Sequence, residues 1–268
     1  MKKSINFDYK YDSDPQERLR LIEEVGFSGI YIHSQYKPSD YIDLICKSSL
    51  TIESLHLPYK KMDQGRSIDS RYVNVLWEDD DKSSSYVEEL IREVRFAHEY
   101  GINIVVMHVT GGDAPPPMSE NGIRNIGRVL NVCEQYNITL CLENLRRLDY
   151  LDYAFESLPS DKLMFCFDSG HANYMTTNVD SFPWSRYENK LCYLHLNDND
   201  GLGDQHLVPF SGNINWQQLI KVIFGLNPRL SLQLEVRSSS ETRKRYSERQ
   251  YLELCFNSLA RLEGLLGV

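Results

Sequence analysis

Acidic and imidazole side chains end several of the apolar, strand-like segments of this sequence. Carboxylates close three of them: Glu143 in ITLCLEN, Asp168 in LMFCFDSGH and Glu235 in LSLQLEV. Histidines stand at or near the ends of three more: His56, His108 and His195. A carboxylate at the end of a buried strand costs free energy unless it is paired, hydrogen-bonded or bound to a metal. One divalent cation would satisfy several of these groups together, and mixed nitrogen and oxygen donors suit Zn2+, Mn2+, Fe2+ or Co2+ better than Ca2+.

Three polar residues in the following loops extend this set. His171 lies three residues beyond Asp168, and we assign it to the same site. Asp204 and His206 lie in the Gly- and Asp-rich segment after His195. Such segments favour turns, so two interpretations of this pair stay open: a second metal site, or a pair that orders the loop.

Other histidines and one basic run have alternative roles. His56 and His108 either bind metal or hydrogen-bond substrate or loop groups. His33 and His98 are expected to be structural, with His98 on a solvated helix face. The basic run RKRY at Arg243–Tyr246 is also interpreted as a solvated face, with contact to a substrate phosphate as the alternative.

Hydrophobic patterning shows which elements must position these residues. Short runs rich in β-branched and aromatic residues alternate with stretches of helical periodicity. The expected strands are Ser4–Phe7, Gly29–His33, Ile52–His56, Ile102–His108, Ile138–Glu143, Leu163–Asp168, Leu191–Leu196 and Leu230–Val236. The expected helices lie near 15–25, 39–48, 84–100, 119–136, 149–158, 215–224 and 246–265, with a weaker one around 173–189.

Eight strand–helix units predict an α/β fold, a single (β/α)8 TIM barrel that spans residues 1–268 as one domain. A doubly wound open sheet is the rival. No GxGxxG opens the first strand–helix turn, which argues against a dinucleotide-binding sheet and a nucleotide cofactor. In a barrel, the carboxyl ends of all the strands open onto one face, so the polar strand ends would converge. The stretch Lys61–Lys82 is too long for a simple turn and is expected to be a loop or lid at that face.

Composition and charge narrow the choice of partners. The chain has 268 residues, of which 41% are hydrophobic and 25% charged, and acids outnumber bases 38 to 29 for a net charge of −9. A field of this sign opposes phosphate backbones, which argues against nucleic acid and anionic membranes. No apolar run approaches the roughly 20 residues that span a bilayer, and MKKSINFDYKYD lacks the apolar core of a secretory signal. Because the six cysteines show no CxxC spacing, a reduced, cytoplasmic protein is expected.

Three segments carry a resemblance to a known family. CFDSGHANY, HLNDNDGLGDQHLVPFSGNINW and LEV at the end of the last strand resemble the xylose-isomerase-like barrel superfamily. That superfamily contains sugar and sugar-phosphate isomerases and epimerases, and also the endonuclease IV type of apurinic-site nuclease. In the isomerase branch, the resemblance implies one catalytic metal held by Glu143, Asp168, His195 and Glu235. It also implies that Glu143 and Glu235 move the substrate proton as an acid/base pair, and that His171 hydrogen-bonds substrate oxygens.

The nuclease branch is matched by residue types as well. It binds three zinc ions with nine ligands, and this sequence has a candidate for each: His56, His108, Glu143, Asp168, His171, His195, Asp204, His206 and Glu235. Tyr59, in HLPY, resembles the tyrosine that follows the first nuclease histidine. Basic DNA-gripping loops are not apparent, and no arginine soon follows His195, where some ketose epimerases place a substrate-binding one. The set of candidate metal ligands alone therefore does not distinguish the isomerase branch from the nuclease branch.

Proton-transfer chemistry favours the isomerase branch. Moving hydrogen between neighbouring carbons of a sugar requires a C–H bond beside a carbonyl to become acidic, and a divalent metal stabilises the resulting enediolate. A carboxylate over that carbon acts as general base and returns the proton as its conjugate acid. We therefore expect an isomerase or epimerase that uses Zn, Mn, Co or Mg and acts on a small-molecule sugar or sugar phosphate. The alternatives are a zinc phosphodiesterase at abasic sites, a metal-dependent lyase of a hydroxy acid, and a non-catalytic carbohydrate-binding barrel. Whether the chain forms a homo-oligomer stays open.

Overall fold

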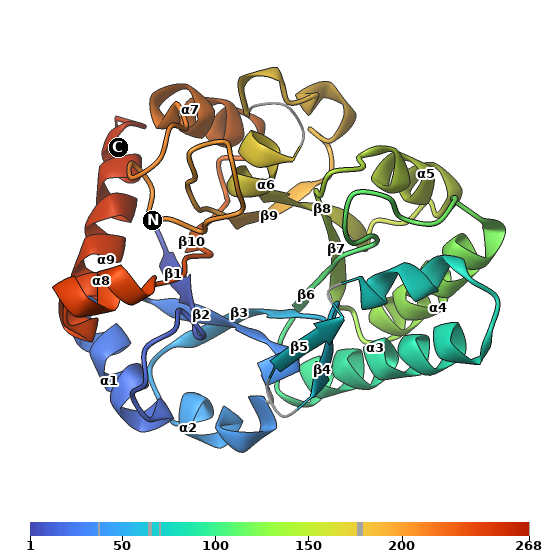
Figure 1. Cartoon of the computed structure of the whole chain (residues 1–268), viewed down its shortest axis with the longest axis horizontal. Coiled ribbons are helices and arrows are strands. Elements are labelled where there is room, and N and C mark those ends of the chain that lie inside the picture. The colour runs from blue at the N-terminus through green and yellow to red at the C-terminus, as the bar shows by residue number, and fades with distance from the viewer. Residues whose placement is uncertain (37, 64–65, 70, 176–178, 268) are drawn as a thin grey trace. The chain divides into compact units, whose positions relative to one another are not determined.

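Strands and helices alternate along the computed structural model of the chain, which describes residues 1–36, 38–63, 66–69, 71–175 and 179–267 (Figure 1). The strands are β1 Lys3–Asn6, β2 Gly29–His33, β3 Thr51–His56, β4 Lys61–Asp63, β5 Arg66–Asp69, β6 Ile104–Met107, β7 Thr139–Glu143, β8 Leu163–Asp168, β9 Leu191–His195 and β10 Leu232–Leu234. The α-helices are α1 Pro15–Val25, α2 Ile42–Cys46, α3 Asp81–Glu99, α4 Glu120–Gln135, α5 Asp149–Ser157, α6 Ser169–Tyr174, α7 Trp216–Leu226, α8 Ser240–Arg245 and α9 Glu248–Gly264. Short 3₁₀ helices are η1 Ser34–Tyr36, η2 Pro38–Asp40, η3 Tyr72–Trp77, η4 Val179–Ser181 and η5 Trp184–Arg186.

Eight of the strands form one sheet in the order β10-β1-β2-β3-β6-β7-β8-β9. The pairings of β1 with β10 and β2, of β6 with β3 and β7, and of β7 with β8 are all parallel. A parallel bridge pairs Leu196, which directly follows β9, with Leu234 of β10, so the first and last strands of this order are joined. Because the sheet returns to its starting strand, the predicted (β/α)8 fold is confirmed and the open doubly wound sheet is wrong.

Backbone contacts divide the chain into two compact units. The first unit contains Met1–Ile32, Pro38–Glu53 and Phe167–Val268, and the second contains His33–Lys37 and Ser54–Cys166. In the part of the chain that the structure describes, no helix combines the length and the apolar character needed to cross a membrane. Four of the six cysteines are buried: Cys133, Cys141, Cys166 and Cys255. A single domain over residues 1–268 and a cytoplasmic location stay predictions.

Capping residues set the helix boundaries of the first unit. The Asp14 side chain accepts hydrogen bonds from the backbone N–H groups at the start of α1, and Pro15 presets the helical φ, so α1 begins where the sequence predicts. Ser247 and Gln250 form a capping box that starts α9. The helix expected over 246–265 is therefore confirmed as α9, whereas α8 just before it was not expected.

The helix expected around 173–189 is wrong as a continuous element. In the described residues of this stretch, α6 ends at Tyr174, η4 covers Val179–Ser181 and η5 covers Trp184–Arg186, while residues 176–178 lie outside the described part. A proline lies just before η5, and proline lacks the N–H that a continuing helix needs. Three short segments in the described residues therefore replace one helix.

Helices α3 and α4 lie side by side in the second unit and pack against η3 (Figure 1). Trp77, at the end of η3, is buried and donates its indole N–H to the Val109 carbonyl at 2.7 Å. A Cβ on Gly122 of α4 would lie 2.0 Å from Cε3 of this ring, so the close packing requires glycine. Trp77 therefore belongs to the core.

The stretch Lys61–Lys82, expected to be a loop or lid, is partly regular. β4 and β5 pair as an antiparallel hairpin, and η3 follows them. Residues 64, 65 and 70 lie outside the described part of the chain. The role of this stretch as a lid stays a prediction.

Candidate active site

The predicted site residues stand where their strands end, and their side chains are buried. Four are the last residues of β3, β7, β8 and β9, in that order: His56, Glu143, Asp168 and His195. Two directly follow β6 and β10: His108 and Glu235. Buried polar groups need partners, so the contacts of each unit decide what these residues can do.

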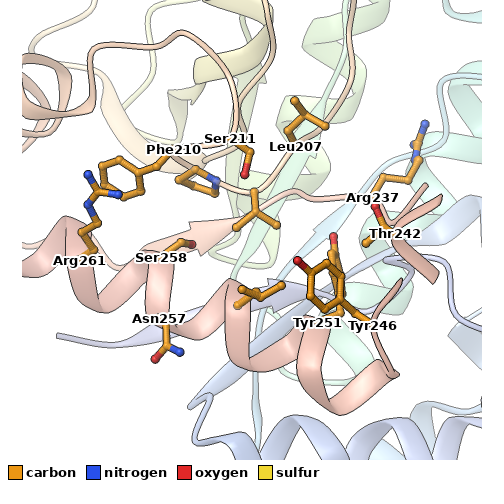
Figure 2. Close-up of a pocket in the computed structure, with 13 residues that line it drawn as sticks. Leu207, Phe210, Ser211, Arg237, Thr242, Tyr246, Tyr251, Asn257, Ser258 and Arg261 are labelled. Atoms are coloured by element: carbon orange, nitrogen blue, oxygen red, sulfur yellow. The ribbon is translucent and has the colours of Figure 1, made fainter. Parts of the chain in front are cut away.

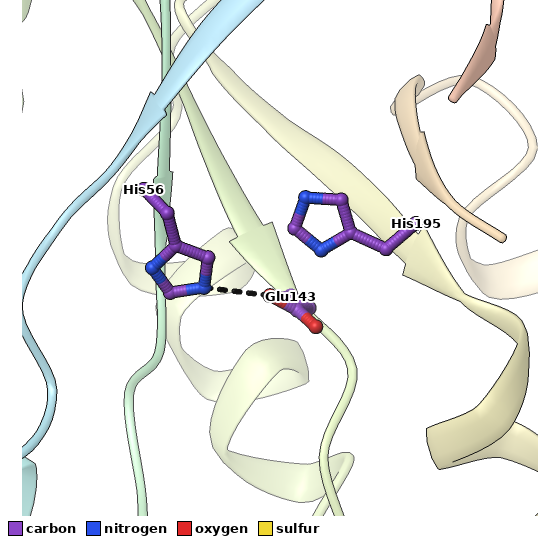
Figure 3. A group of neighbouring side chains, drawn as sticks. All are labelled: His56, Glu143 and His195. Atoms are coloured by element: carbon purple, nitrogen blue, oxygen red, sulfur yellow. Dashed lines mark hydrogen bonds and ion pairs between the residues drawn. The ribbon is translucent and has the colours of Figure 1, made fainter. Parts of the chain in front are cut away.

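Two histidines of the second unit converge on one carboxylate. The Nε2 atoms of His56 and His108 each lie 3.1 Å from Oε2 of Glu143. Figure 3 shows the His56 ring directed at the Glu143 carboxylate; His195, also drawn there, belongs to the first unit. Two imidazole nitrogens therefore share one carboxylate oxygen in a buried environment.

The other ring nitrogen of His56 identifies its tautomer. Nδ1 lies 2.8 Å from the Leu57 carbonyl oxygen, which can only accept, so Nδ1 carries the hydrogen. Burial lowers the pKa of His56 to about 4, although the hydrogen bond with Glu143 acts in the opposite direction. In the neutral ring, Nε2 then offers a lone pair to a carboxylate oxygen, an arrangement that needs a cation or a proton between them. Metal-binding histidines have this pattern, because their second nitrogen donates to a backbone carbonyl.

Two further rings contact this cluster. The His33 ring lies 4.8 Å from that of His56 at an interplanar angle of 24°, and it is buried. The Tyr59 ring lies 4.2 Å from that of His108. His33, expected to be structural, is therefore in contact with a candidate site residue, and its own position at the end of β2 was the signal for this.

Three side chains of the first unit converge in a similar way. One ligand atom each of Asp168, His195 and Glu235 lies within 4.8 Å of the other two. Nδ1 of His195 lies 3.1 Å from Oε2 of Glu235. Asp168 and His195 are fully buried, and Glu235 is 7% exposed. Two carboxylates thus share a region with little water, where nearby positive charge is needed to stabilise them.

Hydrogen bonds hold the Asp168 carboxylate in place. Its Oδ1 accepts the backbone N–H of His171 at 2.6 Å, and its Oδ2 accepts the side-chain amide of Asn197 at 2.8 Å. A Cβ on Gly170 would lie 1.9 Å from Oδ1 of Asn197, so this approach requires glycine. Asn197 is absent from the predicted site, although the polar run NDND after the strand was a signal for it.

Tyr31 orients the His195 ring. The two rings stack with centroids 4.8 Å apart and an interplanar angle of 17°, and Tyr31 is buried. In the sequence, Tyr31 sits inside an apolar strand, so nothing there separated it from ordinary core residues.

Asp204 links two histidines in the segment after β9. Its Oδ2 lies 3.2 Å from Nε2 of His206 and 3.8 Å from Nε2 of His171. Burial opposes ionisation of Asp204, but the two histidines outweigh it and hold its pKa well below the usual range. Burial likewise acts to lower the pKa of His206, yet Asp204 raises it overall. An ion pair that orders the loop accounts for this contact, and a second metal site here stays a prediction.

The donor set of the first unit fits a divalent cation. Carboxylate oxygens and an imidazole nitrogen are ligands that Zn2+ and Mn2+ accept, and the anionic groups require compensating charge. The hydrogen bonds to Asp168 and the ring stacked on His195 fix two of these ligands in advance.

Comparison with known proteins assigns the family. The model of the xylose isomerase-like TIM barrel family matches residues 19–253. The chain belongs to this family. The uncharacterized protein y4fM of Sinorhizobium fredii is 26% identical to it over 290 residues, which cover 96% of this chain and 91% of y4fM.

Solved structures resemble this xylose isomerase-like chain over nearly its whole length. D-psicose 3-epimerase from Clostridium cellulolyticum, solved with D-tagatose, has a TM-score of 0.76 and 12% identity, covering 99% of both chains. The TTHB071 protein from Thermus thermophilus, soaked with ZnCl2, has a TM-score of 0.71 and 21% identity, covering 99% of this chain and 97% of its own. At these identities the likeness establishes the fold.

Proposed function

We propose that this xylose isomerase-like chain is a metal-dependent isomerase or epimerase that acts on a small sugar or sugar phosphate. The convergence of the buried Asp168, His195 and Glu235 carries the proposal. A purely structural role would not explain two carboxylates placed together on apolar strands. The fold neighbours support the assignment, since one is a D-psicose 3-epimerase solved with D-tagatose and another was soaked with ZnCl2.

The proposed metal ligands are Asp168, His195 and Glu235 of the first unit together with Glu143 of the second. The first three are supported by their convergence, and Glu143 by the family resemblance and by the two imidazoles directed at its carboxylate. A bound divalent cation would supply electrostatic stabilisation for the negative charge that develops on the sugar oxygens.

Glu143 and Glu235 are the proposed acid/base pair. One carboxylate removes the proton from the carbon beside the sugar carbonyl, and the carboxylic acid form of either one returns a proton to the enediolate. Return from the opposite face inverts that carbon, which is an epimerisation. His171, close to both Asp168 and Asp204, is proposed to hydrogen-bond a sugar hydroxyl.

Calorimetric titration of metal-depleted protein with Mn2+ tests the metal centre. We expect about one cation per chain, bound with mixed nitrogen and oxygen donors. His195→Ala and Asp168→Asn should abolish binding. Asp200→Asn, an exposed change five residues beyond His195, is the matched control and should bind normally. Absence of cation binding to the wild-type protein would overturn the proposal.

Turnover is tested on ketoses and their phosphates, including D-tagatose, with the metal-loaded protein. Glu143→Gln and Glu235→Gln should each lower the rate by about a hundredfold or more, because each removes a group that exchanges the proton. Near-normal turnover by either variant would contradict the two-carboxylate mechanism.

A zinc phosphodiesterase is the second candidate. The observations in its favour are the donor groups beyond the four proposed ligands, namely His56 and His108 around Glu143 and the Asp204 pair with His206. It predicts about three zinc ions per chain and cleavage of abasic DNA, because clustered metals generate hydroxide and stabilise the leaving oxygen. A stoichiometry near one cation per chain and no cleavage would exclude it.

A further inference from the structure

A pocket lies in the first unit, apart from the proposed metal ligands. It is formed by the segment Leu207–Ser211, by Arg237 after β10, and by residues of α8 and α9 (Figure 2). Its volume is about 450 Å3, within the range of small-molecule sites. Figure 2 shows Phe210 and Arg261 at one end and Arg237 with Thr242 at the other. None of the proposed metal ligands lines it.

The pocket wall is positively charged. Arg237 and Arg261 line it, and none of the described residues that line it carries a carboxylate. The chain as a whole has a net charge of −9, so the positive charge of the pocket wall is opposite in sign to the net charge of the chain. A guanidinium group only donates hydrogen bonds, and it matches phosphate or carboxylate oxygens in a bidentate fashion. The wall therefore complements an anion that is rich in acceptors.

Arg261 is held in position by an aromatic ring. Its Cζ atom lies 3.7 Å from the centroid of the Phe210 ring. This stacking is a cation–π contact that restricts the guanidinium before any ligand arrives. Less side-chain freedom is then lost on binding, which favours affinity.

Tyr251 also lines the pocket, but its hydroxyl is buried. Its side chain is only 2% exposed. Burial, with a contribution from the neighbouring Cys255, raises the pKa of Tyr251 well above its usual value, so the hydroxyl keeps its proton. Because the hydroxyl is inaccessible, Tyr251 offers a ligand ring surface and no hydrogen bond.

We propose that this pocket binds a small polyol with one anionic group, either a sugar phosphate or a sugar acid. Arg261 binds the anionic group, and Arg237 and Thr242 at the other end of the pocket donate to polyol oxygens. Leu207 and Leu254 offer apolar surface to the C–H faces of the polyol. Because no proposed metal ligand lines the pocket, the assignment does not rest on the proposed isomerase activity.

The pocket borders the segment that carries His206. Leu207 follows His206 directly and exchanges two backbone hydrogen bonds of 2.8 Å with Asp198, and the Arg237 N–H donates to the His206 carbonyl at 2.9 Å. A ligand held between Leu207 and Arg237 would lie beside two residues that flank the His206 backbone, one in sequence and one through a hydrogen bond.

Calorimetric titration of the full, metal-depleted chain tests the proposal with D-fructose 6-phosphate, D-gluconate, D-fructose and inorganic phosphate as probes. We expect binding of at least one of the two anionic polyols and none of D-fructose at the same concentration, and the anion that binds identifies the charged group. Arg261→Met should weaken binding about tenfold or more, since a charge-assisted hydrogen bond is lost, and Arg237→Met about threefold to tenfold.

The matched control is Arg92→Met, which lies in the second unit and should leave binding unchanged. Thermal unfolding of each variant shows that it is folded. Failure of both anionic polyols to bind, or equal binding of inorganic phosphate alone, would overturn the proposal. Binding that survives both pocket variants and is lost in Asp168→Asn would place the ligand at the metal cluster and would also overturn it.

Discussion

Asp198 is the polar centre of the segment after β9, and removal of its charge should destabilise the first unit. Its carboxylate is fully buried. It accepts four N–H groups: Asn199 N at 2.9 Å and Ile214 N at 3.3 Å on Oδ1, and Phe210 N at 2.9 Å and Trp216 Nε1 at 2.8 Å on Oδ2. One side chain thus accepts hydrogen bonds from both ends of the loop that carries Asp204 and His206.

The size of the effect follows from the acceptor count. In Asp198→Asn one oxygen becomes an NH2 group, which faces two N–H donors and cannot accept from them. Hydrogen bonds to charged groups contribute about 1.5–3 kcal/mol each, so losing two predicts a decrease of about 3–6 kcal/mol in the free energy of unfolding. A decrease of this size is at the upper end for one substitution.

Urea unfolding followed by circular dichroism measures this decrease. The matched control is Asp200→Asn, because the Asp200 carboxylate accepts from Leu202 N and Gln205 Nε2 in an exposed setting. The control should cost less than about 1 kcal/mol, since water replaces the lost partners. A decrease below about 1 kcal/mol for Asp198→Asn, or an equal decrease in both variants, would refute the reasoning.

Two further predictions concern helices. In Gly122→Ala the added Cβ meets the buried Trp77 ring, so the free energy of unfolding should fall by about 1–3 kcal/mol. In Gly225→Ala of α7 the added Cβ meets nothing within 4 Å, so the free energy of unfolding should rise by about 0.5–1 kcal/mol. Thermal unfolding of both variants checks this, and an equal gain in the two would contradict it. Burial, with repulsion from Glu89, raises the pKa of Glu93 to about 6 from its ordinary 4.5, so the folded state holds a proton that the unfolded chain releases between these values. The cost of burying the charged Glu93 carboxylate is absent below about pH 4.5 and complete above about pH 6. Glu93→Gln should therefore raise the free energy of unfolding by about 1 kcal/mol at about pH 7.5 and hardly at all at about pH 4. An equal gain at both pH values would contradict this prediction.

Strand positions could be predicted because apolar runs end at polar residues or turns. Gly29–His33 and Leu163–Asp168 were predicted with the bounds that the structure has, and α1 covers the stretch 15–25 where a helix was expected. α8 was missed because its sequence is polar throughout and gives no periodicity. The capping box at Ser247 was a readable sign that α9 begins separately.

The candidate site could be predicted only at the level of residue types and strand ends. Polar residues after apolar runs identify Glu143, Asp168 and Glu235, since parallel strands gather their carboxyl ends. The contacts of Asn197 with Asp168 and of Tyr31 with His195 depend on tertiary packing between elements distant in sequence. Periodicity within one element carries no information on such contacts.

Exchange of solvent deuterium into a ketose, followed by NMR, tests the central claim most directly. Metal-loaded protein should incorporate deuterium at the carbon beside the carbonyl of its sugar substrate, since a carboxylate removes that proton and exchanges it with solvent. The double variant Glu143→Gln with Glu235→Gln should show no incorporation, because no carboxylate is then left to remove the proton. If the wild-type protein binds its cation but exchanges no deuterium into any ketose or ketose phosphate, the assignment as an isomerase or epimerase is contradicted.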